Sequence, residues 1–180
     1  MRIKDMAIIA MFTALTAVLS QISIPLPFSP VPITLQTFAV YLTGIILGCR
    51  KGTLALLVYA LIGLFGLPVF SQGKSGLPVL VGPTGGYIFG FILAVYIVGK
   101  IIERSDNISF LRSLWALIFG FLIIYALGVG QLQVVLGLSF KEAFVIGALP
   151  YLILELVKIM IGAYLGCTVR KAMQNAFPDL

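Results

Sequence analysis

The chain has 180 residues, of which 61% are hydrophobic and only 10% are charged, and it carries a net charge of +6. Its mean hydropathy of +1.15 leaves too little polar surface to cover a soluble domain of this size, so the composition favours an integral membrane protein. With about 20 residues for each crossing, the length predicts an all-α bundle of six transmembrane helices, forming a single domain over residues 1–180.

The same composition disfavours several function classes. The sequence has no histidine, the commonest general base and metal ligand, so we expect no enzyme, no metal site and no cofactor. The basic residues lie in short clusters between apolar runs, so membrane topology explains the positive charge better than nucleic-acid binding does. Cys49 and Cys167 lack CxxC spacing, and we expect them to be packing residues.

Six apolar stretches are the predicted membrane spans, with approximate limits. The first follows Arg2, Lys4 and Asp5 and extends to about Ile24, without a clear signal-peptide cleavage motif after it. The other five cover about residues 33–48, 53–66, 87–102, 114–136 and 143–169.

Two of the connectors between these spans are also largely apolar. Residues 23–34 contain four prolines and no charge, which predicts an extended loop lying on or dipping into the bilayer surface. Residues 67–86 are rich in glycine and carry Lys74 as their only charge. They lack the GxxxxGK[ST] arrangement of a phosphate loop, so this segment is either a plain connection or a backbone that approaches a ligand closely.

Lysine and arginine are distributed unequally between the two sides of the predicted bundle. If the N-terminus lies inside, nine basic residues fall on the inner side and two, Lys74 and Lys141, fall on the outer side. This bias predicts that both termini are cytoplasmic. The inner nine are Arg2, Lys4, Arg50, Lys51, Lys100, Arg104, Arg112, Arg170 and Lys171.

Glu155 and Lys158 are ionisable residues well inside the last predicted span. A charge in the membrane is costly, so such residues usually face a partner or a wet cavity, and the i, i+3 spacing lets these two pair on one helix face. They form either a mutually neutralising structural pair or part of a site for a small polar solute. Pro150 near the start of the span places them one to two turns deeper, in the outer half of the membrane.

Other polar side chains gather in the same outer half. Gln36, Tyr87 and Gln131 lie near the outer ends of the second, fourth and fifth spans, accompanied by Gln21 and Gln133. The inner half shows no comparable set of polar residues. This asymmetry favours a pocket that is open to the outside, with a few polar groups in apolar walls, over a continuous polar pore.

Small residues form a stripe along the first predicted helix. Ala7, Ala10, Ala14 and Ala17 follow one another at spacings of three or four residues, and such stripes let helix backbones approach closely in lipid. The stripe serves either packing within the chain or docking of another membrane protein.

Several motifs carry a resemblance to a known family. Essentially the whole chain, in order and in spacing, resembles the BioY family, the biotin-specific S-components of energy-coupling-factor (ECF) ABC transporters. The family's last helix usually reads Pro-x-x-Pro-x-Asp-x-x-Lys, whereas this chain has Ile153 at the second proline and Glu155 at the aspartate. The matching residues are Pro30-Val31-Pro32-Ile33-Thr34-Leu35-Gln36-Thr37, Gly66-Leu67-Pro68-Val69-Phe70, Gly82-Pro83-Thr84-Gly85-Gly86-Tyr87 with Gly90-Phe91, and Tyr125, Gly128 and Leu132 of a YxxGxxxL segment.

The resemblance implies a function and partners. It implies capture of biotin from outside a prokaryotic cell and uptake across the plasma membrane, together with a transmembrane T-component and two cytoplasmic ATPases. Biotin would be the transported ligand rather than a cofactor, and Ala10 and Ala14 would contact the T-component. The candidate biotin contacts are Glu155, Lys158, Gln36, Tyr41, Lys74, Tyr87 and Gln131.

Three alternatives stay open at this point. The same S-component fold could serve another vitamin, such as thiamin or riboflavin. A stand-alone channel would need polar lining in both membrane halves. An intramembrane hydrolase or an acyl or prenyl transferase would need a catalytic constellation, and the sequence offers no histidine and a single buried carboxylate for one.

Overall fold

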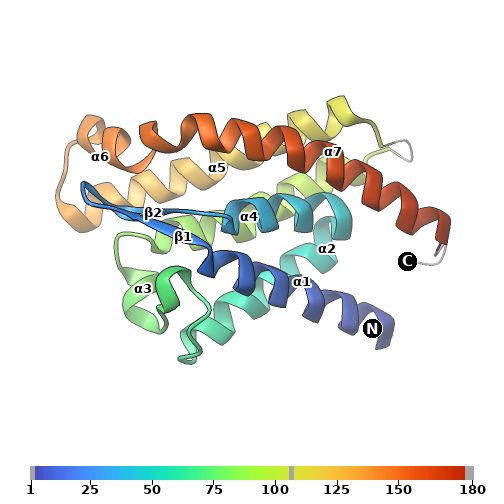
Figure 1. The fold of residues 1–180 in the computed structure, drawn as a ribbon, viewed down its shortest axis with the longest axis horizontal. Helices are drawn as coiled ribbons and strands as arrows, with labels where there is room; N and C mark the ends of the chain where they lie inside the picture. Colours follow the sequence, from blue (N-terminus) through green and yellow to red (C-terminus); the bar gives the residue numbers. More distant parts are fainter. Residues whose placement is uncertain (1–2, 106–107, 177–180) are drawn as a thin grey trace.

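The computed structural model describes residues 3–105 and 108–176, and most of them are helical (Figure 1). Arg2, which belongs to the predicted inner basic group, lies outside the described residues. In chain order the elements are α1 (Ile3–Gln21), β1 (Ser23–Leu26), β2 (Ser29–Thr34), α2 (Gln36–Leu64), η1 (Ser71–Gly73), α3 (Leu77–Val81), α4 (Gly85–Glu103), α5 (Phe110–Leu136), α6 (Phe140–Gly147), η2 (Leu149–Tyr151) and α7 (Leu152–Ala176).

The long helices confirm a multi-pass membrane protein. Among the described residues, five helical stretches are long and apolar enough to cross a membrane, and buried side chains from α1, α2, α4, α5 and α7 pack into one core. These stretches are Ile3–Gln21, Gln36–Leu64, Gly85–Glu103, Phe110–Leu136 and Phe140–Ala176.

The second stretch, α2, contains both the second and the third predicted spans. Gly48 interrupts the helix with a φ of 74°, in the left-handed region that favours glycine. A Cβ added at Gly52 would lie 3.2 Å from the carbonyl oxygen of Thr43, although nine residues of a straight helix extend for about 13.5 Å. The chain therefore reverses at Gly48, and α2 has two arms, as Figure 1 shows.

The two apolar connectors are more ordered than the sequence predicts, so the expectation of a purely α-helical protein is wrong for residues 23–34. There β1 and β2 form an antiparallel hairpin that pairs Ser23 with Thr34 and Leu26 with Ser29. Prolines are tolerated because both strands of a two-stranded sheet are edge strands. At an edge, a backbone position that points away from the partner strand needs no N–H donor. The glycine-rich connector likewise contains the short helices η1 and α3.

The last predicted span is also divided. Ala148 has non-helical angles (φ −127°, ψ −51°), and the chain passes through η2 before α7 begins. Pro150 lacks the N–H that a continuing α-helix would need, which explains the break. The break places Tyr151 and Glu155 beside the β1–β2 hairpin and the start of α2, as their hydrogen bonds show.

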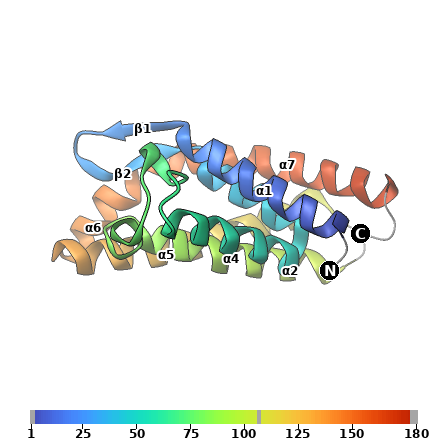
Figure 2. The ribbon, with the colours of Figure 1, turned by 90° about the horizontal axis from the view of Figure 1, so that it is seen from below.

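The two ends of the bundle differ in character. Both termini lie at one end, and the β1–β2 hairpin, α3 and α6 lie at the other (Figures 1 and 2). Arg50, Lys51, Lys100 and Arg170, from three helices, surround one cavity at the end with the termini. Four of the nine basic residues that the sequence places on one side therefore lie together in space.

Candidate ligand-binding site

Glu155 and Lys158 form a buried ion pair in the first turns of α7. The Glu155 residue is only 2% exposed, and the Lys158 Nζ lies 2.6 Å from its Oε1. The Thr37 hydroxyl donates to the same oxygen at 2.8 Å, and the Tyr41 hydroxyl donates to Oε2 at 2.6 Å. Lys158 also donates to the Thr34 carbonyl oxygen at 2.7 Å and to the Thr37 Oγ1 at 3.0 Å.

This network decides what each charged group can still do. An ammonium has three N–H donors, and Thr34, Thr37 and Glu155 take all three of those on Lys158. A carboxylate oxygen accepts about two hydrogen bonds, so Oε1 of Glu155 is saturated while Oε2 keeps one free acceptor position. Glu155 can therefore bind one further N–H donor without losing a partner.

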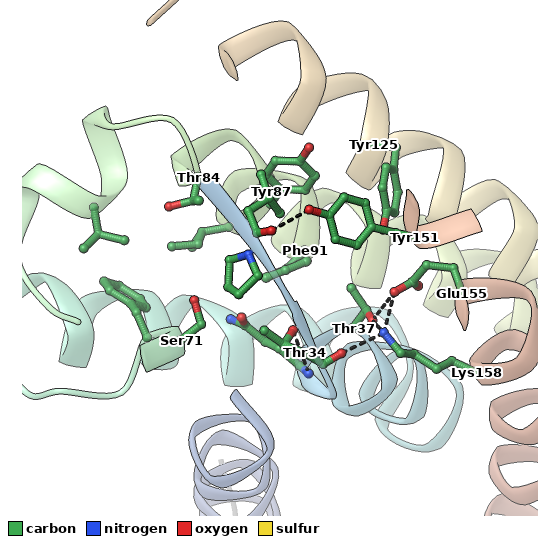
Figure 3. Close-up of a pocket in the computed structure, with 16 residues that line it drawn as sticks. Thr34, Thr37, Ser71, Thr84, Tyr87, Phe91, Tyr125, Tyr151, Glu155 and Lys158 are labelled. Atoms are coloured by element: carbon green, nitrogen blue, oxygen red, sulfur yellow. Dashed lines mark hydrogen bonds and ion pairs between the residues drawn. The ribbon is translucent and has the colours of Figure 1, made fainter. Parts of the chain in front are cut away.

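The pair lies at one end of a pocket that is enclosed by residues of β2, α2, η1, α3, α4, α5, η2 and α7. Figure 3 shows Glu155 and Lys158 on one side, Ser71 and Thr84 on the other, and aromatic side chains between them. The lining residues are Val31, Pro32 and Thr34 of β2, Gln36 and Thr37 of α2, Phe70 and Ser71, Val79, Thr84, Tyr87, Ile88 and Phe91 around α3 and α4, Tyr125 of α5, Tyr151 of η2, and Glu155 and Lys158.

Tyrosines form much of the aromatic wall. The Tyr125 ring packs against Tyr87, with centroids 5.7 Å apart, and against Tyr151 at 6.4 Å. The Tyr87 hydroxyl donates to the Gly147 carbonyl oxygen at 2.7 Å, and the Tyr151 hydroxyl donates to the Val31 carbonyl oxygen. Within residues 3–105 and 108–176 the Tyr125 hydroxyl has no hydrogen-bond partner, which leaves it free for a ligand.

Two glycines of the predicted motifs allow close packing around the pocket. A Cβ at Gly128 of α5 would overlap the Tyr87 ring, and a Cβ at Gly85 would overlap the Leu80 backbone carbonyl. Gly128 therefore makes room for the Tyr87 ring, and Gly85 lets the first turn of α4 approach the backbone of α3 closely. The glycine-rich connector is thus more than a plain connection, because it also contributes Ser71 and Thr84 to the pocket.

Of the seven predicted site residues, four line the pocket, one lies behind it and two lie outside it. Glu155, Lys158, Gln36 and Tyr87 line the pocket, and the Gln36 amide also donates to the Tyr59 hydroxyl at 2.7 Å. Tyr41 lies behind the pocket and holds Glu155.

The structure does not bring the other two predicted residues into the pocket. The Gln131 amide donates to the carbonyl oxygens of Leu80 and Gly82, both at 2.8 Å, and so fixes the end of α3. Lys74 is exposed beside a neighbouring cavity of about 420 Å³, which shares Val79 and Thr84 with the pocket.

Sequence reasoning missed several lining residues. Thr34 and Thr37 lie inside the Pro30–Thr37 motif, but the motif alone does not indicate that they bind Lys158. Tyr125 belongs to the YxxGxxxL segment, which was a usable signal. Tyr151 follows Pro150 directly, and an aromatic residue next to a helix break was the signal there.

Most of the alanine stripe of α1 lies on the outside of the bundle, although Ala17 is partly buried against the core. Ala10 and Ala14 are exposed, while α1 buries its opposite side through Phe12, Thr13 and Thr16. Packing within the chain, one of the two interpretations of the stripe, is therefore wrong for Ala10 and Ala14. The surface formed by Ala10 and Ala14 is open to lipid or to another protein.

Comparisons with known proteins agree with this architecture. Residues 1–175 match the model of the BioY family. Biotin transporter BioY of Thermotoga maritima is 44% identical over 160 residues, which cover 89% of this chain and 92% of that protein. Biotin transporter BioY of Rhizobium etli is 36% identical over 179 residues, with 94% of each chain covered.

A solved structure shares the fold. The crystal structure of the S-component for biotin from an ECF-type ABC transporter superposes with a TM-score of 0.86 at 24% identity, covering 94% of this chain and 92% of that one. The match to the family model over nearly the whole chain, together with relatives at up to 44% identity, decides the assignment. The chain belongs to the BioY family.

Proposed function

We propose that this protein is a biotin-binding S-component, which captures biotin outside the cell and delivers it with an ECF energising module. The observation that carries the proposal is the pocket itself: a buried Glu155–Lys158 pair at one end, an aromatic wall beside it, and a chain of the BioY family around both. Biotin has a matching division into a polar ureido ring, an apolar thioether ring and a carboxylate tail.

The ureido ring fits the end of the pocket that holds the ion pair. One of its two N–H groups can donate to the free acceptor position on Glu155 Oε2. Its oxygen can accept from the Tyr125 hydroxyl, which has no other partner among the described residues. A hydrogen bond to a carboxylate is charge-assisted and strong in a dry site. Lys158 acts in this scheme by pairing with the Glu155 carboxylate and holding it in place.

The thioether ring fits the wall between the polar ends. Phe91, Tyr87 and Tyr125 offer ring faces and edges to an apolar group, and a thioether sulfur packs favourably against aromatic rings. The carboxylate tail would then point away from Glu155, toward Ser71 and Thr84, where hydroxyl groups can donate to it.

Binding requires the pocket to widen. Its free volume is about 50 Å³, whereas small-molecule sites typically enclose about 300–1,000 Å³. One wall of the pocket is the β1–β2 hairpin, whereas residues 67–84 are held by hydrogen bonds from Gln21, Tyr59 and Gln131. The hairpin is held to η2 and α6 by the Tyr151 hydroxyl on Val31 and by the Ser29 hydroxyl on the Ile146 carbonyl oxygen. We propose that the hairpin moves to admit biotin.

The orientation follows from charge. If the two arms of α2 count as separate crossings, the chain crosses six times, and both termini lie on one side, at the end rich in basic residues. The positive-inside rule makes that side cytoplasmic and turns the biotin pocket outward, in the plasma membrane of a prokaryote. The exposed Ala10 and Ala14 give a transmembrane T-component a close-packing surface, and two ATPases would bind through that partner.

Titration calorimetry of the purified protein tests the ligand. Biotin should bind with one site. Thiamin and riboflavin should not bind, because thiamin is a cation without a urea group and the flat tricyclic ring of riboflavin is larger than the bicyclic ring of biotin. Binding of thiamin or riboflavin in place of biotin would show that the protein is specific for another vitamin. Binding of none of them by folded protein would contradict the proposal.

A further inference from the structure

Another cavity lies at the end of the bundle that holds both termini, far from the biotin pocket. Its volume is about 570 Å³, within the usual range for sites that hold small ligands, and it is enclosed by residues of α1, α2, α4 and α7. Its rim carries four basic side chains, Arg50, Lys51, Lys100 and Arg170, and one carboxylate, Glu103. The proposed transport function does not use this cavity.

Among residues 3–105 and 108–176, the positive charge in the cavity is only partly neutralised. The Lys51 ammonium lies 2.7 Å from the Asp5 carboxylate. Glu103 accepts the backbone N–H of Cys49 at 2.8 Å, which holds its carboxylate at the turn around Gly48. Three basic side chains in the lining therefore face a single carboxylate after the Lys51–Asp5 pair is set aside.

The remaining donors are arranged for an anion. Arg170 is half-buried and uses one guanidinium nitrogen to donate to the Ile45 carbonyl oxygen at 2.7 Å, so its planar group is anchored in the wall with other N–H groups left to donate. A guanidinium fork matches phosphate oxygens, and lysine adds a point charge. The Lys100 Nζ lies 4.9 Å from the centre of the Tyr96 ring, which also lines the cavity.

We propose that this cavity binds a phosphate group, supplied by the headgroup of an anionic phospholipid in the leaflet at the basic end of the bundle. Basic pockets between transmembrane helices on the cytoplasmic side are known binding places for such headgroups. The cavity also has apolar walls, including Ile8 and Met173, and α1 and α7 present exposed apolar side chains to the acyl region. A soluble phosphate would use the basic groups but not these apolar surfaces.

Lipid binding by the whole protein tests the proposal. Native mass spectrometry in a neutral detergent would count bound dioleoyl phosphatidylglycerol and, separately, dioleoyl phosphatidylcholine. The cavity variant is Arg50→Gln/Lys100→Gln, which leaves the half-buried Arg170 in place. The matched control is Arg104→Gln/Lys171→Gln, which removes two exposed basic residues that do not line the cavity. Thermal unfolding checks that all three proteins are folded.

We expect phosphatidylglycerol to bind the parent protein in preference to phosphatidylcholine. The cavity variant should bind it about 30-fold more weakly, which corresponds to about 1 kcal/mol for each basic residue removed. The control should stay within about twofold of the parent. Equal weakening in the two variants, or no preference for the anionic lipid, would overturn the proposal.

A competition experiment identifies the source of the phosphate. If the lipid headgroup is the ligand, sn-glycerol 3-phosphate at equal concentration should displace little phosphatidylglycerol. Complete displacement would mean that the cavity binds a soluble phosphate ester, and the lipid proposal would be wrong. If the cavity variant bound lipid normally and instead failed to assemble with a T-component, the cavity would be a protein interface and the lipid proposal would be wrong.

Discussion

Replacing Lys158 with methionine tests whether the buried ion pair is one electrostatic unit. The substitution keeps most of the apolar stem and removes the ammonium, which donates to the Thr34 carbonyl oxygen, to Thr37 and to Glu155 at 2.6–3.0 Å. The carboxylate of Glu155, on a residue only 2% exposed, would keep the hydroxyls of Thr37 and Tyr41 and lose its cation.

The expected cost is large because the remaining charge is buried. Removing one partner of a buried ion pair costs about 3–5 kcal/mol, a sizeable part of a total stability of about 5–15 kcal/mol. The double variant Glu155→Leu/Lys158→Met removes the unpaired carboxylate as well, so it should be clearly more stable than Lys158→Met alone. Neither variant should bind biotin.

Reversible unfolding in mixed micelles of mild and denaturing detergent would measure these differences. The exposed Lys141→Met is a matched control and should change the free energy of unfolding by no more than about 0.5 kcal/mol. The reasoning would be refuted if Lys158→Met cost no more than Lys141→Met. It would equally be refuted if the double variant were as unstable as the sum of its two single variants.

Three further predictions concern other parts of the chain. Tyr125→Phe should weaken biotin binding by about 1 kcal/mol, or about fivefold by calorimetry, with unchanged thermal stability, because it removes only a hydroxyl that has no partner among the described residues; unchanged affinity would exclude this contact. Gly128→Ala should lower stability by about 1–3 kcal/mol because its Cβ would overlap the Tyr87 ring, whereas Gly130→Ala, which meets open space, should be neutral or stabilising; thermal unfolding that showed the reverse order would contradict this packing. Ala10→Trp should leave biotin binding intact and reduce copurification with a T-component, and normal assembly would exclude that surface as the interface.

Much of the fold could be predicted because apolar length and charge placement are local properties. The apolar runs gave the positions of the long helices, and the basic cluster at residues 49–52 correctly marked the turn at Gly48. The β1–β2 hairpin could not be predicted in the same way, since its four prolines argue against a strand unless each strand is known to be an edge.

In the site, too, the residues that a local pattern identifies could be predicted, and their partners from distant parts of the chain could not. Glu155 and Lys158 were identifiable because charges inside an apolar helix are conspicuous, and their spacing gave the ion pair. Their partners Thr34, Thr37 and Tyr41 lie more than 110 positions away in the chain, and only the fold brings them near.

Polar residues at helix ends were the weakest guide. Gln36 reaches the pocket, whereas Gln131 uses its amide to hold the backbone around α3, and the sequence pattern does not distinguish these two uses. The cavity at the basic end was missed for a similar reason, because membrane topology already explained its arginines and lysines.

The structure of the protein with biotin bound is the most direct test of the proposed site. We predict a ureido nitrogen within about 3.2 Å of Glu155 Oε2, with the ureido oxygen near the Tyr125 hydroxyl and the carboxylate tail toward Ser71 and Thr84. Biotin bound with its carboxylate tail at Lys158, or bound outside the pocket between β2, α2, α4 and α7, would contradict the account.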